Sequence, residues 1–547
     1  MSDLLIREVV AVDGDGEVRG GEASDVLVVD GRIAAIAPAG SLARDAPAAA
    51  AVVEGDGRLL LPGFVDAHSH ASGRVFDADV QLALLRQGVT SVIAGQDGVG
   101  WAPGDGAYAT EYFAAIDGPH PGYAGGGVAE LLAAHDGTTP LNVGYLVPAG
   151  TVRHLVTGRS TDAPSPDELA AMVRLVAEGL EAGALGLSTG LDYVPGIFAS
   201  TTELTALARP VAEAGGVVAS HLRGGYESGS AAGVAELAAI ARDAGTRVHI
   251  SHFHAEPAIV LELMAGLAAG DLAGGRPVDA TFDAYPYGRG CSILAMPILP
   301  ASLTVRPVDE VLAVLRDPAE RARLLDEWFP TIVDYPSLGP DWPSMLTFAH
   351  VAAAEYDWAH GLTLAEAAAR HGVAPADLAL DVLVASRLEV NVVMSVRAER
   401  SDADLARILA HPAALGGSDG IFVGRHPHPR ARGTFARYLD LLVRTDHGPG
   451  ARLDWAGAAA LCSTRAADRF ALGDRGRVRV GAVADLVLVD PAAVRDRATY
   501  DRPLELAEGI DDVVVAGVPV LARGALTCRT PGRGLRRAAR AARPEVG

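Results

Sequence analysis

Residues 61–70 read Leu61-Pro62-Gly63-Phe64-Val65-Asp66-Ala67-His68-Ser69-His70, an apolar run followed by two histidines that are separated by one residue. In an extended chain, residues i and i+2 point to the same face, so His68 and His70 are predicted to converge on one point. Imidazoles that converge at the end of a strand suit a divalent transition metal, most often zinc. Two hydrogen-bonded histidines in a loop would give the same short pattern, so the downstream sequence has to decide between these interpretations.

The composition favours a large protein that acts on a small molecule. The chain has 547 residues, of which 49% are hydrophobic and 21% charged, and its net charge is −22. This negative charge disfavours nucleic acid and anionic membranes as partners. No early apolar segment has a basic front and a cleavage site, and no apolar run approaches membrane-spanning length. We therefore expect a cytoplasmic protein with no nucleic-acid or membrane partner. The sequence does not decide whether the protein forms a homo-oligomer.

The use of cysteine and lysine excludes several kinds of site. Cys291, Cys462 and Cys528 are too few and too scattered for a disulfide framework or a cysteine-built zinc site. All 46 basic residues are arginines. The chemistry therefore uses no Schiff-base lysine, no phosphate-binding Walker lysine and no carboxylated lysine that bridges two metals.

Both ends of the chain are predicted to be β structure. Within residues 1–57, the pair Asp30-Gly31 between two apolar runs predicts a hairpin. Within residues 471–528, Asp485–Val489 and Val513–Val520 have the character of short strands. We predict that the two ends form one small β-sandwich domain, because the ends of a domain often lie close together.

Residues 58–470 alternate between short apolar runs and helical patterns. Ser165 and Ser200 each begin such a pattern with a capping sequence. Eight strands with intervening helices predict an α/β fold, a (β/α)₈ TIM-like barrel with its active site at the carboxyl ends of the strands. The eight candidates are Leu59–Val65, Val89–Ala94, Leu141–Val147, Ala184–Ser188, Val217–Ser220, Arg247–Ser251, Asp279–Ala284 and Leu415–Ser418.

Two segments depart from this alternation. Residues from about 300 to 387 separate the seventh and eighth strand candidates and carry helical patterns of their own. They predict a subdomain inserted over the barrel mouth. Residues 529–547 are basic and lack an apolar pattern, so we expect a disordered tail.

Side chains that can bind metals fall at the ends of the predicted strands. Four histidines and two carboxylates in one barrel mouth are costly to bury unless something binds them, so we predict a site for one or two divalent metal ions. Taken singly, His221 or His252 would more often be a hydrogen-bonded core histidine, and Asp97 or Asp419 a turn or cap residue. His249 lies three residues before His252 on the same predicted strand. Neighbouring positions in a strand point to opposite faces, so His249 is predicted to point away from the site. The six candidate ligands are His68, His70, Asp97, His221, His252 and Asp419.

Longer segments narrow the function. Residues 62–70 and Gly417-Ser418-Asp419-Gly420 are typical of the amidohydrolase superfamily, which the chain resembles over nearly its whole length. Within that superfamily the chain is similar to the N-acyl-D-amino-acid deacylases (D-aminoacylases). The segments that carry this closer resemblance are Gly186-Leu187-Ser188-Thr189-Gly190-Leu191-Asp192-Tyr193, Asp283-Ala284-Tyr285-Pro286-Tyr287 and His426-Pro427-His428-Pro429-Arg430.

The resemblance implies a metal-dependent amide hydrolase with zinc as its cofactor. His221 and His252 would hold the tighter metal together with a bridging residue, and His68 and His70 would lie near a weaker second one. Asp419 matches the catalytic aspartate of the family, which would take a proton from water and later give it to the leaving amine.

Three departures from the family pattern affect these expectations. The deacylases carry a cysteine where this chain has Asp97, so the metal is one or two zinc ions or another divalent ion. The family's lysine for the substrate carboxylate is replaced by His254, a weaker and pH-dependent anion partner. A pocket histidine of the family is missing from Pro148–Arg153.

The candidate residues for substrate recognition come from the same resemblance. Arg430 could bind a carboxylate with two parallel hydrogen bonds or only hold its loop by an ion pair, whereas Arg289 would more often be a solvated loop residue. The full set is Tyr193, Arg223, His254, Tyr285, Arg289 and Arg430.

These observations favour hydrolysis of the amide bond of an N-acyl amino acid, D-configured by resemblance, or of a related N-acylated metabolite such as a specialised-metabolism intermediate. A cyclic-amide hydrolase of the hydantoinase or dihydroorotase type is an alternative, which the long insert and the missing lysine disfavour. A metal-free binding protein on the same barrel is another alternative. It would have lost ligand positions, whereas all six are present here.

Overall fold

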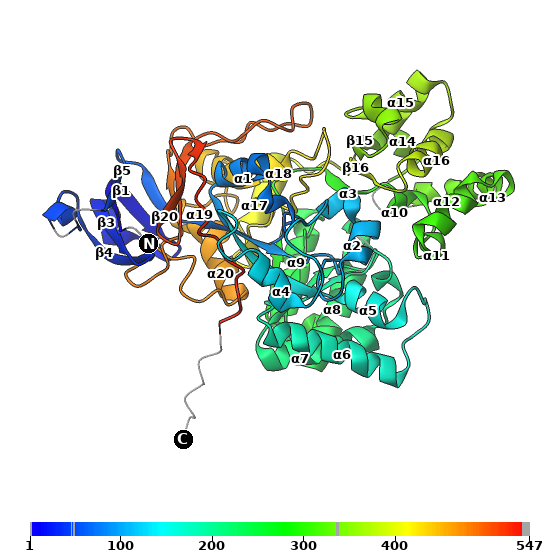
Figure 1. Cartoon of the computed structure of the whole chain (residues 1–547), viewed down its shortest axis with the longest axis horizontal. Helices are drawn as coiled ribbons and strands as arrows, with labels where there is room; N and C mark the ends of the chain where they lie inside the picture. Colours follow the sequence, from blue (N-terminus) through cyan, green and yellow to red (C-terminus); the bar gives the residue numbers. More distant parts are fainter. Residues whose placement is uncertain (1–2, 45, 48–49, 225, 335–337, 539–547) are drawn as a thin grey trace.

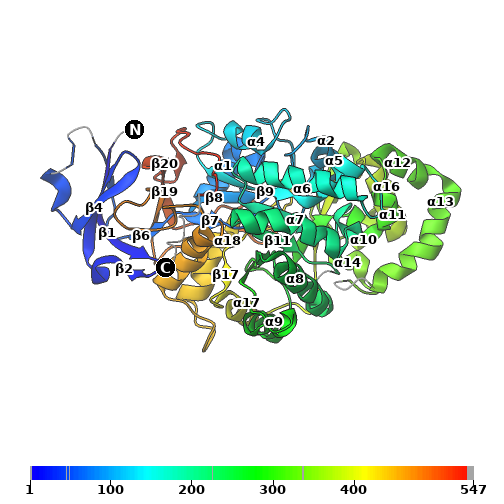
Figure 2. The ribbon, with the colours of Figure 1, turned by 90° about the horizontal axis from the view of Figure 1, so that it is seen from below.

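The computed structural model describes residues 3–44, 46–47, 50–224, 226–334 and 338–538. Three sheets organise these residues: one built from both chain ends, one of eight parallel strands, and a three-stranded sheet in an insert. Figures 1 and 2 show the first and the last of these at opposite ends of the molecule, with the eight-stranded sheet and its helices between them. No helix among the described residues is both long and apolar enough to cross a membrane.

The eight-stranded sheet is the predicted barrel. Its strands are parallel, and their order in the sheet follows their order in the chain. Hydrogen bonds join its two edges, because the amide of Ala67 donates to the carbonyl of Gly416 (2.9 Å) and the amide of Asp419 donates to the carbonyl of His68 (2.8 Å). The strands are β7 (Phe64–Asp66), β8 (Val89–Ala94), β9 (Asn142–Pro148), β10 (Gly186–Gly190), β11 (Val217–His221), β12 (Arg247–Ile250), β13 (Ala280–Asp283) and β17 (Ala414–Leu415).

Helices cover the outside of the barrel, and the local sequence sets where they begin. The hydroxyl of Ser165 accepts a hydrogen bond from the amide of Glu168 at the start of α6 (Pro166–Glu181). Ser200 caps α7 (Thr201–Ala214) in the same way. The other covering helices are α1 (Ala78–Leu85), α4 (Val128–Ala134), α8 (Ser230–Ala244), α9 (Pro257–Ala269), α17 (Asp402–Leu409) and α18 (Arg430–Leu439).

Both chain ends pair in one ten-stranded sheet, as the sequence predicts. The C-terminal strand β18 (Leu486–Val489) pairs with β6 (Leu59–Pro62), which in turn pairs with the N-terminal strand β1 (Leu4–Asp13). Asp30-Gly31 forms the predicted hairpin. The remaining main strands are β3 (Ala23–Val29), β4 (Arg32–Pro38), β5 (Ala51–Glu54), β19 (Ile510–Val515), β20 (Val518–Ala522) and β21 (Ala525–Leu526).

The first predicted strand, Leu59–Val65, divides at Gly63. The part before Gly63 is β6 of the terminal sheet, and only the part after it, β7, enters the barrel. A Cβ at residue 63 would lie 2.4 Å from the hydroxyl oxygen of Thr90, so the chain passes between the two sheets where only glycine fits.

The insert is larger than the predicted 300–387. Its sheet pairs β14 (Gly290–Ile293) and β15 (Leu346–Val351) with β16 (Val390–Met394), so strands on both sides of the predicted range belong to it. These short strands pair only with each other, and a local pattern does not reveal such pairing. The insert has its own apolar core, and its helices are α10 (Ala295–Ile298), α11 (Ala301–Thr304), α12 (Val308–Arg316), α13 (Pro318–Arg323), α14 (Trp342–Met345), α15 (Leu364–His371) and α16 (Pro375–Ala385).

The prediction of a disordered tail is wrong for residues 529–538, and residues 539–547 lie outside the described range. The amide of Val143 donates to the carbonyl of Arg533 (2.9 Å), and the amide of Leu535 donates to the carbonyl of Val143 (2.8 Å). The side chain of Leu535 is buried with Phe470 and Leu472 among the apolar residues inside the barrel. The segment therefore packs against the barrel, which its basic composition did not indicate.

We expect Leu535→Ala to lower the free energy of unfolding by about 2–4 kcal/mol, because it leaves a cavity in this buried cluster. The matched control is Leu504→Ala, since Leu504 is 47% exposed. Thermal unfolding of both variants measures the effect. Equal midpoints for the two variants would mean that the tail contributes nothing to stability.

Candidate metal centre

The six candidate ligands come together at the carboxyl ends of the barrel strands. His68 and His70 follow β7, Asp97 follows β8, and His221 is the last residue of β11. His252 follows β12, and Asp419 follows β17. All six residues are at least 90% buried. Asp97, His252 and Asp419 have positive backbone φ angles, so the chain turns sharply just beyond each of these strands.

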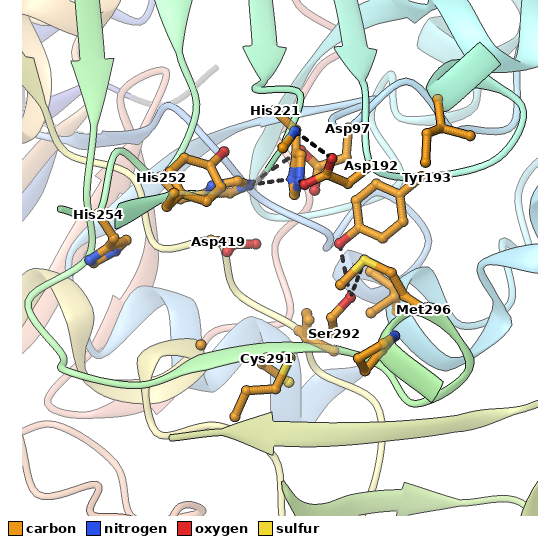
Figure 3. Close-up of a pocket in the computed structure, with 18 of the residues that line it drawn as sticks. Asp97, Asp192, Tyr193, His221, His252, His254, Cys291, Ser292, Met296 and Asp419 are labelled. Atoms are coloured by element: carbon orange, nitrogen blue, oxygen red, sulfur yellow. Dashed lines mark hydrogen bonds and ion pairs between the residues drawn. The ribbon is translucent and has the colours of Figure 1, made fainter. Parts of the chain in front are cut away.

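These residues form two groups that share Asp97. The first group contains His68, His70, Asp97 and Asp419, and the second contains Asp97, His221 and His252. Within each group, the candidate ligand atoms all lie within 4.8 Å of one another. Figure 3 shows the second group from the side of the cavity.

The spacing of these atoms fits ligands of a metal ion. The Nε2 atoms of His68 and His70 lie 3.7 and 3.6 Å from the Asp97 carboxylate, and that of His252 lies 3.5 Å from it. The Nε2 atom of His70 lies 3.3 Å from Oδ1 of Asp419. Two ligands about 2.1 Å from a tetrahedral zinc ion are themselves about 3.4 Å apart.

Hydrogen bonding supports the same interpretation. Both ring nitrogens of His68 and Oδ1 of Asp97 are buried without a hydrogen-bond partner among the described residues. Such orphan atoms are costly unless something binds them. The donor set of imidazoles and carboxylates fits one or two divalent ions, and it is less selective for zinc than a set with a thiolate.

Carboxylates behind the cluster orient two of the histidines. Nδ1 of His70 lies 2.8 Å from Oδ1 of Asp117, and Nε2 of His221 lies 3.3 Å from Oδ2 of Asp192. Each contact leaves the other ring nitrogen facing the cluster, and Figure 3 shows His221 between Asp192 and His252. A carboxylate on the far nitrogen fixes the orientation of an imidazole and raises its basicity as a ligand.

Asp283 organises the bottom of the cluster. Its Oδ1 atom accepts a hydrogen bond from the amide of His252 (2.9 Å), and its Oδ2 atom lies 3.5 Å from Nδ1 of His68. Nε2 of His249 lies 2.8 Å from the same Oδ2 atom, so the prediction that His249 points away from the site is wrong. The strand ends at Ile250 and the chain then turns, so the alternation of side-chain directions within β12 does not apply to His252.

The two carboxylates of the cluster are held ionised. Burial alone would raise the pKa of Asp97, but the neighbouring imidazoles of His68, His252 and His70 outweigh it and hold the pKa well below its ordinary range. Burial would likewise raise the pKa of Asp419, but the charge of Arg430 and the neighbouring histidines lower it. Nη2 of Arg430 lies 2.9 Å from Oδ2 of Asp419.

A cavity of about 320 Å³ opens from the cluster toward the insert. Apart from Arg400, its wall on the insert side is mostly apolar, with Trp328 and Met394 among its residues. Three of the predicted substrate residues line it, namely Tyr193, His254 and Tyr285. Burial and then the charge of Arg400 hold the pKa of His254 well below its ordinary value, so this histidine is neutral near pH 7.

The three predicted arginines do not line this cavity. The guanidinium of Arg223 donates to Glu236 and to the carbonyls of Ile197 and Ala199. That of Arg289 donates to Glu399 and lies over the ring of Tyr500. That of Arg430 is buried between Asp419 and the ring of Tyr285, and its three nitrogens have no hydrogen-bond partner among the described residues.

Sequence reasoning missed four residues of the site. Asp283 is the second-last residue of the predicted strand Asp279–Ala284 and the last residue of β13, so the rule that selected the other candidates could have selected it as well. Asp192 lies within the quoted segment 186–193. Asp117 and Arg400 follow no predicted strand of the barrel, and only the folded chain brings Asp117 to the cluster and Arg400 to the cavity wall.

Comparisons with known proteins point to one family. The family model described as "Amidohydrolase family" matches residues 51–521. The N-acyl-D-glutamate deacylase of Alcaligenes xylosoxydans xylosoxydans is 34% identical over 538 residues, which cover 98% of this chain and 96% of that protein. The D-aminoacylase of the same organism is 31% identical, with 98% of each chain covered.

Solved structures agree. An N-acyl-D-glutamate deacylase from Bordetella bronchiseptica, in complex with zinc and a phosphonate that mimics the tetrahedral intermediate, is 29% identical with a TM-score of 0.77. The match covers 98% of this chain and 99% of that one. An L-hydantoinase from Arthrobacter aurescens is 16% identical with a TM-score of 0.51 over 98% of this chain and 100% of that one, which shows the fold alone.

We expect Asp97→Ala to weaken zinc binding at least tenfold, because both groups lose the ligand they share. Elemental analysis after zinc loading and dialysis measures this. Asp105→Ala, which removes an exposed carboxylate, is the matched control, and Asp97→Cys should retain zinc through its thiolate. An unchanged zinc content in Asp97→Ala would assign Asp97 to the turn alone.

Proposed function

The chain belongs to the amidohydrolase family, and we propose that it is a metal-dependent deacylase that hydrolyses the linear amide bond of an N-acyl amino acid. The observation that carries this proposal is the pair of ligand groups that share Asp97 at the end of the cavity. The names of the relatives support a substrate of D configuration.

The proposed chemistry assigns one role to each part of the cluster. A divalent metal held by these residues would lower the pKa of a water toward neutrality and polarise the amide carbonyl. Asp419 would take the proton of the attacking water and deliver it to the leaving amine. Its Oδ2 is paired with Arg430 while its Oδ1 faces His70, so Arg430 would hold the carboxylate in position.

The cavity supports a substrate with an apolar substituent. Its insert side is lined by Met296, Pro297, Leu299 and Trp328, which cannot solvate a charged group. Such a substituent could lie on the acyl group or on the amino-acid side chain. An N-acylated intermediate of specialised metabolism with an apolar group belongs to the same chemical class.

The alternatives have weaker support. A cyclic-amide hydrolase would share only the fold seen in the hydantoinase comparison, and this chain has no lysine for carboxylation. A metal-free binding protein would not need the two ligand groups.

The net charge of −22 and the free cysteines support a cytoplasmic enzyme with no nucleic-acid partner.

We expect Asp419→Asn to lower kcat by about 10²–10⁴-fold, because the amide cannot accept the proton of water. Amine release from an N-acyl-D-amino acid measures the rate, while circular dichroism and zinc content confirm the fold and the metal site. Asp192→Asn, a change behind His221, should cost less. Activity of Asp419→Asn near that of the parent protein would remove Asp419 from this role.

We expect the zinc-loaded protein to release amine from N-acyl-D-amino acids with an apolar side chain or acyl group, faster than from their L isomers. Hydantoins, as cyclic amides, should not react. Bound zinc without release from any of the linear amides would discard this substrate class. Faster turnover of a hydantoin would favour the cyclic-amide alternative.

A further inference from the structure

Arg400 is the only arginine at the wall of the cavity among the residues that the structure describes. It lies between β16, where the chain leaves the insert, and α17, where it returns to the barrel. The chain has no lysine, so Arg400 is the one side chain at this wall with a permanent positive charge. An N-acyl amino acid carries a carboxylate, which needs such a partner when it is desolvated.

The guanidinium of Arg400 is buried but only partly paired. Its side chain is 6% exposed. Nη1 donates to Oε1 of Glu227, and Nη2 lies 3.3 Å from Nδ1 of His254. Nε has no hydrogen-bond partner among the described residues. A guanidinium has five N–H donors, and these contacts use two of them.

The contact with His254 fixes which nitrogen of that ring carries the proton. A guanidinium only donates hydrogen bonds, so Nδ1 of His254 must accept and its proton lies on Nε2. Nε2 of His254 is also buried without a partner among the described residues. This corner of the cavity therefore has N–H donors to spare, and its permanent charge comes from Arg400 rather than from His254.

We propose that Arg400 recognises the carboxylate of the substrate, with Glu227 holding the guanidinium in position and His254 adding a neutral N–H donor. This inference rests on the proposed deacylase function. Arg400 then determines specificity, since it favours an N-acyl amino acid over a neutral analogue. Arg400 lies on the segment that connects the insert to the barrel, and its partners Glu227 and His254 follow the barrel strands β11 and β12, so this connection and the barrel together would build the recognition site.

The test compares an N-acyl-D-amino acid with the same compound in which a carboxamide replaces the carboxylate. We expect Arg400→Gln to lower kcat/KM for the carboxylate substrate by about 10²–10³-fold, mainly through KM, and to change the carboxamide by less than about threefold. Arg400→Lys should restore part of the loss. Arg397→Gln is the matched control, because Arg397 lies in the same segment, is exposed and donates to the carbonyl of Val333.

A double variant and a binding measurement separate the role of Arg400 from an unpaired Glu227 and from a failure of the deacylase function. Arg400→Gln leaves the Glu227 carboxylate unpaired, so the double variant Arg400→Gln with Glu227→Gln removes both charges and should show the same discrimination. Calorimetric binding of the two compounds to the zinc-loaded parent and variants needs no turnover. If the parent hydrolyses neither compound, the deacylase function fails, while binding still tests Arg400. Equal losses for both compounds, or binding that does not depend on Arg400, would overturn the proposal.

Discussion

The carboxylate of Asp97 lies within 4.0 Å of ring nitrogens of four histidines that come from three different strand ends. The exposed fraction of each of these residues is below one tenth. Burying so many polar groups costs free energy, so the arrangement needs a bound group that offsets this cost. One or two divalent cations held by the two ligand groups that share Asp97 would offset this cost. The barrel can hold such a cluster because its strands end at one mouth and its edges are joined at His68 and Asp419.

A second layer of acids gives the cluster its orientation. Asp117, Asp192 and Asp283 each contact the far side of a histidine or the backbone beside one. They come from different parts of the chain, so the geometry of the ligands depends on the packing of the whole barrel. This layer orients histidines around Asp97 through contacts that do not involve Asp97 itself.

The chain has no lysine, so arginine is the only side chain with a permanent positive charge. Four arginines that lie near the site differ in their partners and in whether they line the cavity. Each of these four arginines has one acidic partner: Asp419 for Arg430, Glu236 for Arg223, Glu399 for Arg289 and Glu227 for Arg400. Of the four, only Arg400 also lines the cavity. The planar guanidinium can bind one carboxylate and still present donors to a second group. A chain of this composition can therefore place a charge in a buried site with one ion pair and leave donors for a ligand.

The sequence by itself determined the features that depend on neighbouring residues. The alternation of apolar runs and helical patterns predicted the barrel, serine caps predicted where α6 and α7 begin, and six side chains at predicted strand ends all reached one cluster. Tertiary structure alone decided where distant segments meet. The division of the first strand at Gly63, the extent of the insert, the packing of Leu535 and the inward direction of His249 all depend on partners far along the chain. The same holds for Arg400, because a burial environment and its ion pairs are properties of the folded chain that no local pattern encodes.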